Sequence, residues 1–398
     1  MKRYVIIGNG TAGASAVEQI RKRDQQGSIK VFTCEKYPYY YRPRLPEYIS
    51  GDSNLDKFTL HPLSKYEEWN VELHLGEPVT AIDPEKKEVT SEKSEKFPYD
   101  ELLLSAGANC YRPPIEGINK EGVFTLRTIE DADSLIAASR KTETAILVGG
   151  GLLGLEAGHA LIKLGLKVEV VEFLDRLLPR QLDNESANLL QGQLAQMGFL
   201  FHLSAKAKEA AGRESVTGLV LENGTFINGA LILFSAGIRP NLDLARSAGL
   251  AIDKAVKVDQ YMRTSIPGIW AAGDITEYNG QPCGLWPVAM NQGKTAGASM
   301  AGELSAYVPL APSATLKVAG IDLISAGDID AENSRTSKRF TKGKVYRKIV
   351  LEEDVIKGII FLGETNGAKK CIALMNEGRH LGSIAQELHR EDFDFSKL

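Results

Sequence analysis

The sequence predicts an α/β fold with two parallel β-α-β units, and three observations support this prediction. An apolar run, a glycine-rich turn and a helical segment follow one another at the N-terminus. The same succession returns near residue 144, and each succession closes on a strand that ends in a glutamate. This order of strand, glycine turn, helix, strand and acid is typical of Rossmann-like dinucleotide-binding domains. We therefore expect two such domains in a chain of 398 residues.

The first unit begins with residues 3–8, which are apolar and rich in β-branched residues and predict a buried strand. "GNGTAG" follows in GxGxxG spacing, residues 11–23 predict a helix, and "IKVFTCE" predicts a strand ending at Glu35. In such a turn the first glycine permits a tight bend, the second lets a pyrophosphate approach, and the third lets helix and strand pack closely. The free N–H groups of the helix N-terminus favour an anion. We assign to this nucleotide Gly8, Gly10, Thr11, Ala12, Gly13, Glu35 and Lys36.

The second unit reads "TAILVGGGLLGLEAG" from residue 144, and its second strand, "KVEVVE", ends at Glu172. We assign to its nucleotide Gly149, Gly151, Leu152, Leu153, Gly154 and Glu172. A carboxylate at Glu172 favours the free 2′-hydroxyl of NADH and repels the 2′-phosphate of NADPH. Arg176 instead favours NADPH, because a nearby arginine can accommodate a phosphate. Two dinucleotides in one chain suggest electron transfer between a flavin nucleotide, near the N-terminus, and a nicotinamide.

Composition and charge exclude several other classes of protein. The net charge is −4 and the pI is near 6.0, so nothing indicates a nucleic-acid partner. No apolar run has the length of a membrane span, and a strand that begins almost at the first residue leads us to expect no secretory signal. Cys34, Cys110, Cys283 and Cys371 are isolated, so neither a zinc site nor an extracellular disulfide framework is expected. We expect a cytoplasmic protein without a metal site.

Four further motifs accompany the two glycine turns. They are "LLLSAGANCYRPP" at 102–114, "LRTIEDADSL" at 126–135, "LFSAGIRPN" at 233–241 and "IWAAGDI" at 269–275. In this order, over roughly residues 1–305, the set resembles the two-dinucleotide flavoproteins of the pyridine nucleotide-disulfide reductase superfamily. The resemblance implies an FAD-binding domain of residues 1–111 and 239–311, interrupted by an NAD-binding domain of residues 112–238.

Residues 312–398 are then a small C-terminal α+β domain, which we expect to cap the flavin domain. Within it, "KVYRKIVLEEDVIKGIIFLG" predicts two strands joined by a charged turn, and "NGAKKCIALMNEG" predicts a helix.

The resemblance also implies further site residues. It assigns to FAD Val79, Ser105, Ala106, Gly107, Arg127, Gly273 and Asp274, and to the NAD-binding domain Ala236 and Gly237. Asp274 is expected at the ribityl chain, whereas an ordinary ion pair is the alternative for Arg127. Trp286 should open a helix whose N-terminus stabilises negative charge on the reduced flavin near N1. Core packing is an equal alternative for Trp286.

The loop "YYYRPRLPE" at 39–47 is too polar for a core strand and is expected to be too rich in proline for a helix. Disulfide reductases of the superfamily carry CxxxxC in this region, and peroxidase and oxidase relatives carry one cysteine. This chain has none, so we expect electrons to leave the flavin without passing through a protein thiol. The resemblance places Arg42 on the FAD pyrophosphate, with Pro43 and Leu45 covering the flavin. A solvated surface loop is the alternative.

One position departs from the ferredoxin reductase relatives, which often carry a lysine where this chain has Glu47. That lysine pairs with a glutamate corresponding to Glu156, near flavin N5. Two carboxylates there would repel each other, so either one is protonated or Arg44 intervenes. We take Pro43, Glu156 and Trp286 as the residues expected closest to the chemistry.

The motifs "PYYYRPRLPEYISG" and "LKVAGIDLISAGDID" are most similar to those of bacterial NADH:rubredoxin reductases, with the flavoprotein portion of nitrite reductases a close relative. This resemblance implies that NADH reduces FAD, which then reduces an acidic carrier protein such as rubredoxin or ferredoxin, or a nitrite reductase. An NADH oxidase and an NADH-sensing flavoprotein with little turnover are the alternatives. Residues 335–348 carry seven lysines and arginines and no acid. We expect them to be either a docking surface or a solvated edge strand.

Overall fold

The computed structural model describes residues 1–309 and 313–398, which fall into two compact units. The first unit comprises Met1–Arg44, Ser53–Cys110 and Gly237–Pro309. The second comprises Leu45–Asp52, Tyr111–Ala236 and the chain from residue 313 onward. The first unit is thus interrupted by the second, as the predicted fold class requires. The domain boundary expected at residues 311/312 lies outside the described residues.

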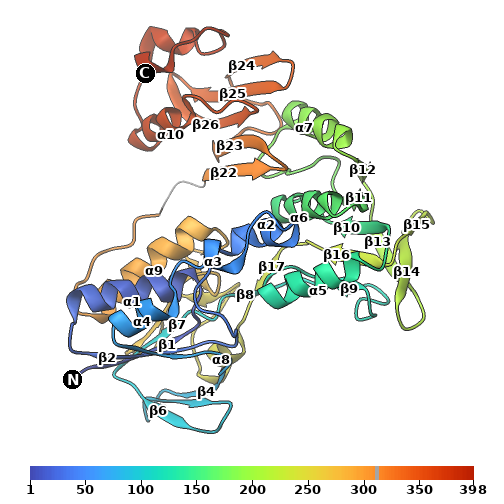
Figure 1. Cartoon of the computed structure of the whole chain (residues 1–398). Coiled ribbons are helices and arrows are strands. Elements are labelled where there is room, and N and C mark those ends of the chain that lie inside the picture. Colours follow the sequence, from blue (N-terminus) through green and yellow to red (C-terminus); the bar gives the residue numbers. More distant parts are fainter. Residues whose placement is uncertain (310–312) are drawn as a thin grey trace. The chain divides into compact units, whose positions relative to one another are not determined.

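A five-stranded sheet forms the centre of the first unit, with the strand order β19-β7-β1-β2-β3. Three of its strands, β1, β2 and β7, are labelled in Figure 1. All its strands are parallel. The strands are β1 (Arg3–Ile7), β2 (Ser28–Phe32), β3 (Val71–His74), β7 (Glu101–Leu104) and β19 (Ile269–Ala271). Because the carboxyl ends of parallel strands share one edge, the motifs that follow β1, β7 and β19 meet there. β2 ends three residues before Glu35, earlier than expected.

Two long helices of the first unit pack together, α1 (Thr11–Arg23) and α9 (Trp286–Met300). Their close approach depends on glycine. A Cβ added at Gly293 would lie 2.2 Å from the carbonyl oxygen of Ala12, and one at Gly297 would lie 2.4 Å from that of Ala16. The contact fixes the N-terminal half of α1 against the C-terminal half of α9.

Smaller elements complete the first unit. Its other short strands are β4 (Val79–Asp83), β5 (Glu88–Ser91), β6 (Lys96–Pro98), β8 (Ala108–Cys110), β17 (Ile238–Pro240), β18 (Val256–Lys257), β20 (Thr276–Tyr278) and β21 (Gln281–Pro282). They pair in antiparallel fashion, except that β18 pairs with β20 in parallel. Its short helices are α3 (Leu55–Phe58), α4 (Leu63–Glu68) and α8 (Asp243–Ser247). The apolar residues of both faces of the parallel sheet, among them Ile6 and Leu104, are buried.

The second unit contains another five-stranded parallel sheet, in the order β12-β11-β10-β16-β9. Its strands are β9 (Val123–Phe124), β10 (Thr144–Val148), β11 (Lys167–Val171), β12 (Phe199–His202) and β16 (Leu231–Phe234). Its helices are α5 (Ile129–Ser139), α6 (Leu152–Lys163) and α7 (Asn184–Gln196). An antiparallel sheet of β13 (Ala207–Gly212), β14 (Val216–Leu221) and β15 (Phe226–Asn228) accompanies it.

The C-terminal region folds as an antiparallel sheet in the order β22-β23-β26-β25-β24 (Figure 1). Its elements are β22 (Ser313–Val318), β23 (Ile321–Gly327), β24 (Ser337–Lys342), β25 (Val345–Glu352), β26 (Val355–Leu362), α10 (Ala368–Glu377), η2 (Gly382–Gln386) and η3 (Phe395–Lys397). The two predicted strands joined by a charged turn and the helix after them are confirmed. α10 packs against β26 and closes an apolar core that includes Ile349 and Phe361.

A buried polar network joins this C-terminal sheet to α7. The Nζ atom of Lys348 lies 3.2 Å from Oδ2 of Asp183, and the two side chains are 0% and 1% exposed. The Tyr346 hydroxyl donates to the same carboxylate at 2.7 Å. Asp183 also caps α7 by accepting from the Ser186 N–H at 3.0 Å. The C-terminal region is thus anchored to the second unit, while a capping role on the flavin domain stays a prediction.

The loop at residues 39–47 differs from the prediction. A 3₁₀ turn, η1 (Arg42–Arg44), runs directly into a short helix, α2 (Leu45–Ile49). The expectation that its prolines exclude helix was wrong, because Pro43 and Pro46 stand in the first turns, where no backbone N–H is needed. Leu45 and Ile49 are buried and supply the apolar contacts that make so short a helix stable.

Candidate nucleotide-binding sites

The first glycine turn combines tight packing with one open position. A Cβ at Gly8 (φ +104°) would lie 2.2 Å from the carbonyl oxygen of Ser105, and a Cβ at Gly13 would lie 2.0 Å from that of Gly8. A Cβ at Gly10, by contrast, would meet no atom within 4 Å. Gly10 provides no side-chain cap to α1, and the first turn of α1 contains no acid. The open space and the uncapped N–H groups fit a pyrophosphate.

The second glycine turn repeats this geometry. A Cβ at Gly149 (φ +112°) would lie 2.4 Å from the carbonyl oxygen of Ser235, and a Cβ at Gly154 would lie 2.8 Å from that of Gly149. Gly151 faces open space, and α6, which begins with Leu152 and Leu153, has neither a side-chain cap nor an acid in its first turn. The second turn therefore fits a second dinucleotide.

Each glycine turn is accompanied by a glutamate that follows the second strand of its unit. Glu35 accepts a hydrogen bond from the Tyr40 hydroxyl at 2.5 Å and forms an ion pair with Arg42. Arg42 thus contacts the residue expected at the adenosine ribose, and its role on the FAD pyrophosphate stays a prediction. Lys36 is exposed beside Glu35. The tyrosine and arginine of the 39–47 loop position the carboxylate.

Glu172 is fixed against the second turn by two backbone groups. Its Oε2 accepts from the Gly150 N–H at 2.6 Å and its Oε1 from the Leu174 N–H at 2.8 Å. The side chain is buried, so the carboxylate is held in place before any ligand binds. Neither Gly150 nor Leu174 was expected from the sequence to contact this glutamate. The middle glycine of "GGG" was the available signal, because a Cβ at Gly150 would lie 3.1 Å from Oε2 of Glu172.

The structure brings the expected flavin motifs of the first unit together. The Ser105 hydroxyl lies 2.9 Å from the carbonyl oxygen of Ile7 and 3.0 Å from that of Gly8, so it braces the first glycine turn. Asn241 holds the next two residues: its side-chain amide donates to the Ala106 carbonyl at 2.9 Å and its N–H to the Gly107 carbonyl at 3.0 Å.

On the other side of α1, a Cβ at Gly273 would lie 3.0 Å from Cβ of Ala12. The Gly273 N–H donates to Oε1 of Gln292 at 2.8 Å, and the Thr276 hydroxyl donates to the same atom. Gln292 is buried in α9 and organises the segment that carries Asp274. Gln292 was not expected from the sequence; an amide pair, Asn291 and Gln292, ahead of the small residues of α9 was the available signal. Burial, with a contribution from Asp274, raises the pKa of the Cys283 thiol to about 12.

Four other assigned residues have clear surroundings within their own units. Trp286 opens α9 and makes an edge-to-face contact with Tyr41, with 5.3 Å between ring centroids. Val79 is buried in the core of the first unit, whereas Pro43 is exposed in η1. Arg127 precedes the capping box of α5 in the second unit, and its N–H donates to Asp131 at 2.8 Å.

At the boundary between the two units, Ala236 and Gly237 (φ +95°) follow Ser235, whose carbonyl backs Gly149. The cofactor roles of all these residues stay predictions.

The expected repulsion between two carboxylates is present in the second unit. Burial raises the pKa of Glu156, and the charge of Glu47 raises it further. The Ala319 N–H of the C-terminal region donates to Oε1 of Glu156 at 3.0 Å and partly offsets this effect. The direction of this pKa shift is the one that protonation of Glu156 requires, and the choice between the two solutions expected for the missing lysine stays a prediction.

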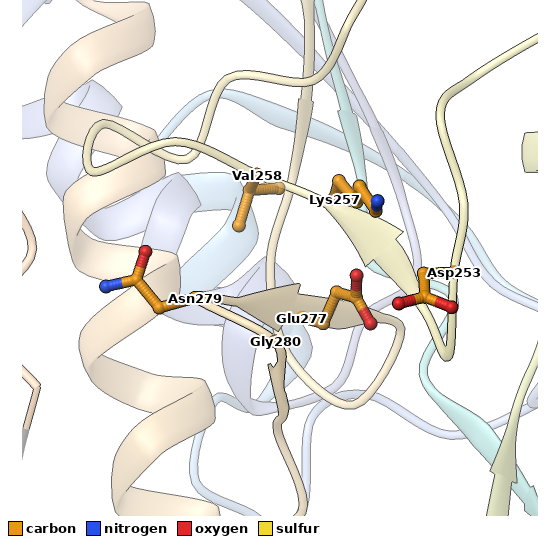
Figure 2. Close-up of a pocket in the computed structure, with 6 residues that line it drawn as sticks. All are labelled: Asp253, Lys257, Val258, Glu277, Asn279 and Gly280. Carbon is orange, nitrogen blue, oxygen red and sulfur yellow. The ribbon is translucent and has the colours of Figure 1, made fainter.

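A cavity of about 250 Å³ in the first unit has a different lining (Figure 2). It is lined by Asp253, Lys257, Val258, Glu277, Asn279 and Gly280, none of which was assigned to a cofactor. The buried Glu277 accepts from the N–H groups of Lys254 and Ala255 at 3.0 and 3.3 Å, so its carboxylate braces the adjacent loop.

Metal-binding clusters and membrane-spanning helices are both absent from the part of the chain that the structure describes. No three His, Cys, Asp or Glu side chains of residues 1–309 and 313–398 are placed to hold a metal ion. Within the same residues, no helix has the length and apolar character to cross a membrane.

Two glycine turns with open helix N-termini, each paired with a fixed glutamate, define an oxidoreductase of the two-dinucleotide class. Residues 2–293 match the model of the pyridine nucleotide-disulphide oxidoreductase family, and residues 312–379 match the rubredoxin NAD⁺ reductase C-terminal domain. The chain belongs to the pyridine nucleotide-disulphide oxidoreductase family. This is a family of FAD- and NADH-dependent enzymes, and the two glycine turns fit those nucleotides.

Several relatives cover nearly the whole chain. It is 35% identical to the nitrite reductase [NAD(P)H] of Bacillus subtilis over 98% of its length, which is 50% of that protein. It is 31% identical to the NADH-rubredoxin oxidoreductase of Clostridium acetobutylicum, covering 96% of this chain and 97% of the relative. The crystal structure of the NADH:rubredoxin oxidoreductase from C. acetobutylicum superposes with a TM-score of 0.81, at 29% identity and 96% and 97% coverage. The chain thus spans about half the length of the nitrite reductase relative.

Proposed function

We propose that this chain takes electrons from NADH and passes them through FAD directly to a small one-electron carrier protein such as rubredoxin. The observation that carries the proposal is the pair of matched glycine turns, each with an open helix N-terminus and a fixed glutamate. The likeness to an NADH-rubredoxin oxidoreductase over nearly the full length of both chains supports the choice of acceptor.

Different residues of the chain would bind the two nucleotides. The first turn of α1 would bind the FAD pyrophosphate, Glu35 would orient the adenosine ribose, and Asp274 would hold the ribityl chain. The first turn of α6 would bind the pyrophosphate of NADH, and Glu172 would orient its adenosine ribose. FAD, when bound, supplies the conversion of a two-electron donor into a one-electron donor.

The cysteines favour direct transfer to the carrier. The loop Tyr39–Glu47, where thiol-dependent members of the superfamily carry cysteine, has none. None of the four cysteines forms a disulfide in the described part of the chain, and burial raises the pKa values of both Cys283 and Cys371 to about 12. Such thiols are almost entirely protonated at neutral pH and are poor redox groups. Cys34 is exposed, but it lies next to Glu35 at the adenosine end.

A second candidate function is electron input to a nitrite reductase. The relative in B. subtilis is twice as long and contains a region equivalent to this whole chain. In that case the acceptor would be a partner protein or a further domain. Both candidates place the enzyme in the cytoplasm, where NADH is available.

The test is anaerobic stopped-flow mixing of the FAD-loaded chain with NADH, followed by mixing with a purified rubredoxin, ferredoxin or nitrite reductase. We expect bleaching of the flavin within the turnover time, and then reoxidation that is fastest with rubredoxin. Fast reoxidation only with nitrite reductase would select the second candidate. A long-lived reduced complex that reacts with none of the acceptors would contradict both and indicate an NADH sensor.

A further inference from the structure

Arg176 lies four residues after Glu172 and raises the question of which nicotinamide nucleotide the second turn prefers. A carboxylate at the end of this strand favours NADH, but a nearby arginine can pair with the 2′-phosphate of NADPH. The answer depends on where the Arg176 guanidinium is held.

The backbone of Arg176 lies close to the acid because the residues on both sides are anchored there. The Leu174 N–H donates to Glu172 at 2.8 Å, and the Leu178 N–H donates to the Gly150 carbonyl at 3.3 Å. Leu178 also has a positive φ of 48°, which is rare for a leucine and bends the segment back toward the glycine turn. Arg176 therefore sits within side-chain reach of the position that a 2′-phosphate would occupy.

Two acids hold the guanidinium of Arg176. Nη1 lies 3.1 Å from Oδ1 of Asp175, and Nη2 lies 3.7 Å from Oε1 of Glu332. The Arg176 side chain is only 15% exposed, although its two partners are largely exposed. Its Nε is buried without a hydrogen-bond partner in the described part of the chain. Glu332 belongs to the C-terminal region, on the segment between β23 and β24.

We propose that Asp175 and Glu332 hold Arg176 away from the adenosine 2′ position, so that the C-terminal region helps the enzyme to prefer NADH over NADPH. The inference rests on the proposed function and deepens it. A 2′-phosphate would have to compete with two carboxylates for this cation, in addition to the repulsion from Glu172. Neutralising the two acids leaves Arg176 as an available partner for the phosphate.

The test uses the full-length, FAD-loaded protein and measures binding of 5′-AMP and 2′,5′-ADP by calorimetry. In the variant Asp175→Asn/Glu332→Gln, affinity for 2′,5′-ADP should rise about threefold to tenfold relative to 5′-AMP, as expected for two exposed ion pairs. Adding Arg176→Gln should abolish this gain. Glu377→Gln, which changes an exposed acid elsewhere in the C-terminal region, should leave the ratio unchanged. Melting temperatures of all variants control for folding.

An unchanged ratio of 2′,5′-ADP affinity to 5′-AMP affinity in the double variant would overturn the inference. So would a tenfold loss of 2′,5′-ADP affinity on Arg176→Gln in the otherwise unaltered protein, because Arg176 would then already contact the phosphate. Failure of 5′-AMP to bind any variant would overturn the proposed NADH site together with this inference. Normal 5′-AMP binding with an unchanged affinity ratio would overturn this inference but leave the proposed NADH site intact.

Discussion

At the scale of single residues, the two glutamates that end the second strands have two tasks. Each is expected to bind an adenosine ribose, and each also braces its surroundings in the protein. Glu172 accepts from two backbone N–H groups, and Glu35 binds a tyrosine and an arginine. A substitution at either residue therefore affects the shape of the site as well as its direct contact with a ligand.

Glu172→Ala is expected to weaken NADH binding at least about tenfold and to narrow the preference over NADPH. The lost hydrogen bond to a charged group is worth about 1.5–3 kcal/mol. Steady-state KM values for both nucleotides provide the measurement. Glu172→Gln is the matched control, because it retains an oxygen acceptor for the Gly150 or Leu174 N–H. Equal use of NADH and NADPH by the unaltered enzyme would refute the role given to Glu172.

The raised pKa of Glu156 predicts a pH dependence with a definite sign. Its folded pKa lies above the ordinary value of 4.5, so its contribution to stability is complete below pH 4.5 and is lost as the pH rises through the folded pKa. Glu156→Gln stays neutral, and the variant should therefore gain stability relative to the unaltered protein as the pH rises from 4.5 toward neutral. Urea unfolding at a series of pH values measures the difference.

Glu47 provides the control for this prediction. Because the charge of Glu47 contributes to the raised pKa, the gain from Glu156→Gln should be smaller in a Glu47→Gln background. A stability difference that does not change with pH would show that Glu156 titrates normally.

At the scale of elements, the sequence predicted those units whose local pattern is complete. The helix at residues 11–23 agrees with α1, and both β-α-β units and the C-terminal hairpin were found, because strand, turn and helix signals all agree there. The short helix α2 was missed because its stability comes from burial of Leu45 and Ile49. The prolines nearby in the sequence indicated a loop instead. The buried positions of Arg347 and Lys348 were also missed, since the Arg390 carbonyl and the Asp183 carboxylate that they contact lie far away in the sequence.

The α1–α9 contact predicts that Gly293→Ala destabilises the first unit by about 1–3 kcal/mol, because the new Cβ would lie 2.2 Å from a backbone oxygen. The shift of α1 should also weaken FAD retention, measured as flavin loss on gel filtration. Gly192→Ala in α7 is the matched control. Its Cβ would meet nothing within 4 Å, so helix propensity alone should stabilise that variant by up to about 1 kcal/mol. Equal melting temperatures for both variants would show that the helices can separate without cost.

At the scale of the whole molecule, the cationic stretch at residues 335–348 is less exposed and less positively charged than its composition indicates. Arg347 and Lys348 are buried, and Lys348 is part of the network around Asp183. Arg335 pairs with Asp328 and Lys342 with Glu391. Much of the positive charge is thus balanced within the C-terminal region. Among these cations, Lys348 attaches the region to the start of α7. Docking of a carrier protein on this stretch stays a prediction, with less support than the sequence alone provided.

This attachment predicts a strong coupling between Lys348 and Asp183. Lys348→Met would leave the Asp183 carboxylate buried without its cation, and Asp183→Asn would do the same to the Lys348 ammonium. Removing one partner of a buried ion pair typically costs about 3–5 kcal/mol. Asparagine still caps a helix, so Asp183→Asn tests the charge and leaves the cap of α7 in place. The double variant Lys348→Met/Asp183→Asn should lose much less than the sum of the two single losses, because neither charge remains unpaired. Guanidinium unfolding of all four proteins provides the cycle, and strictly additive losses would show that the pair does not hold the C-terminal region to α7.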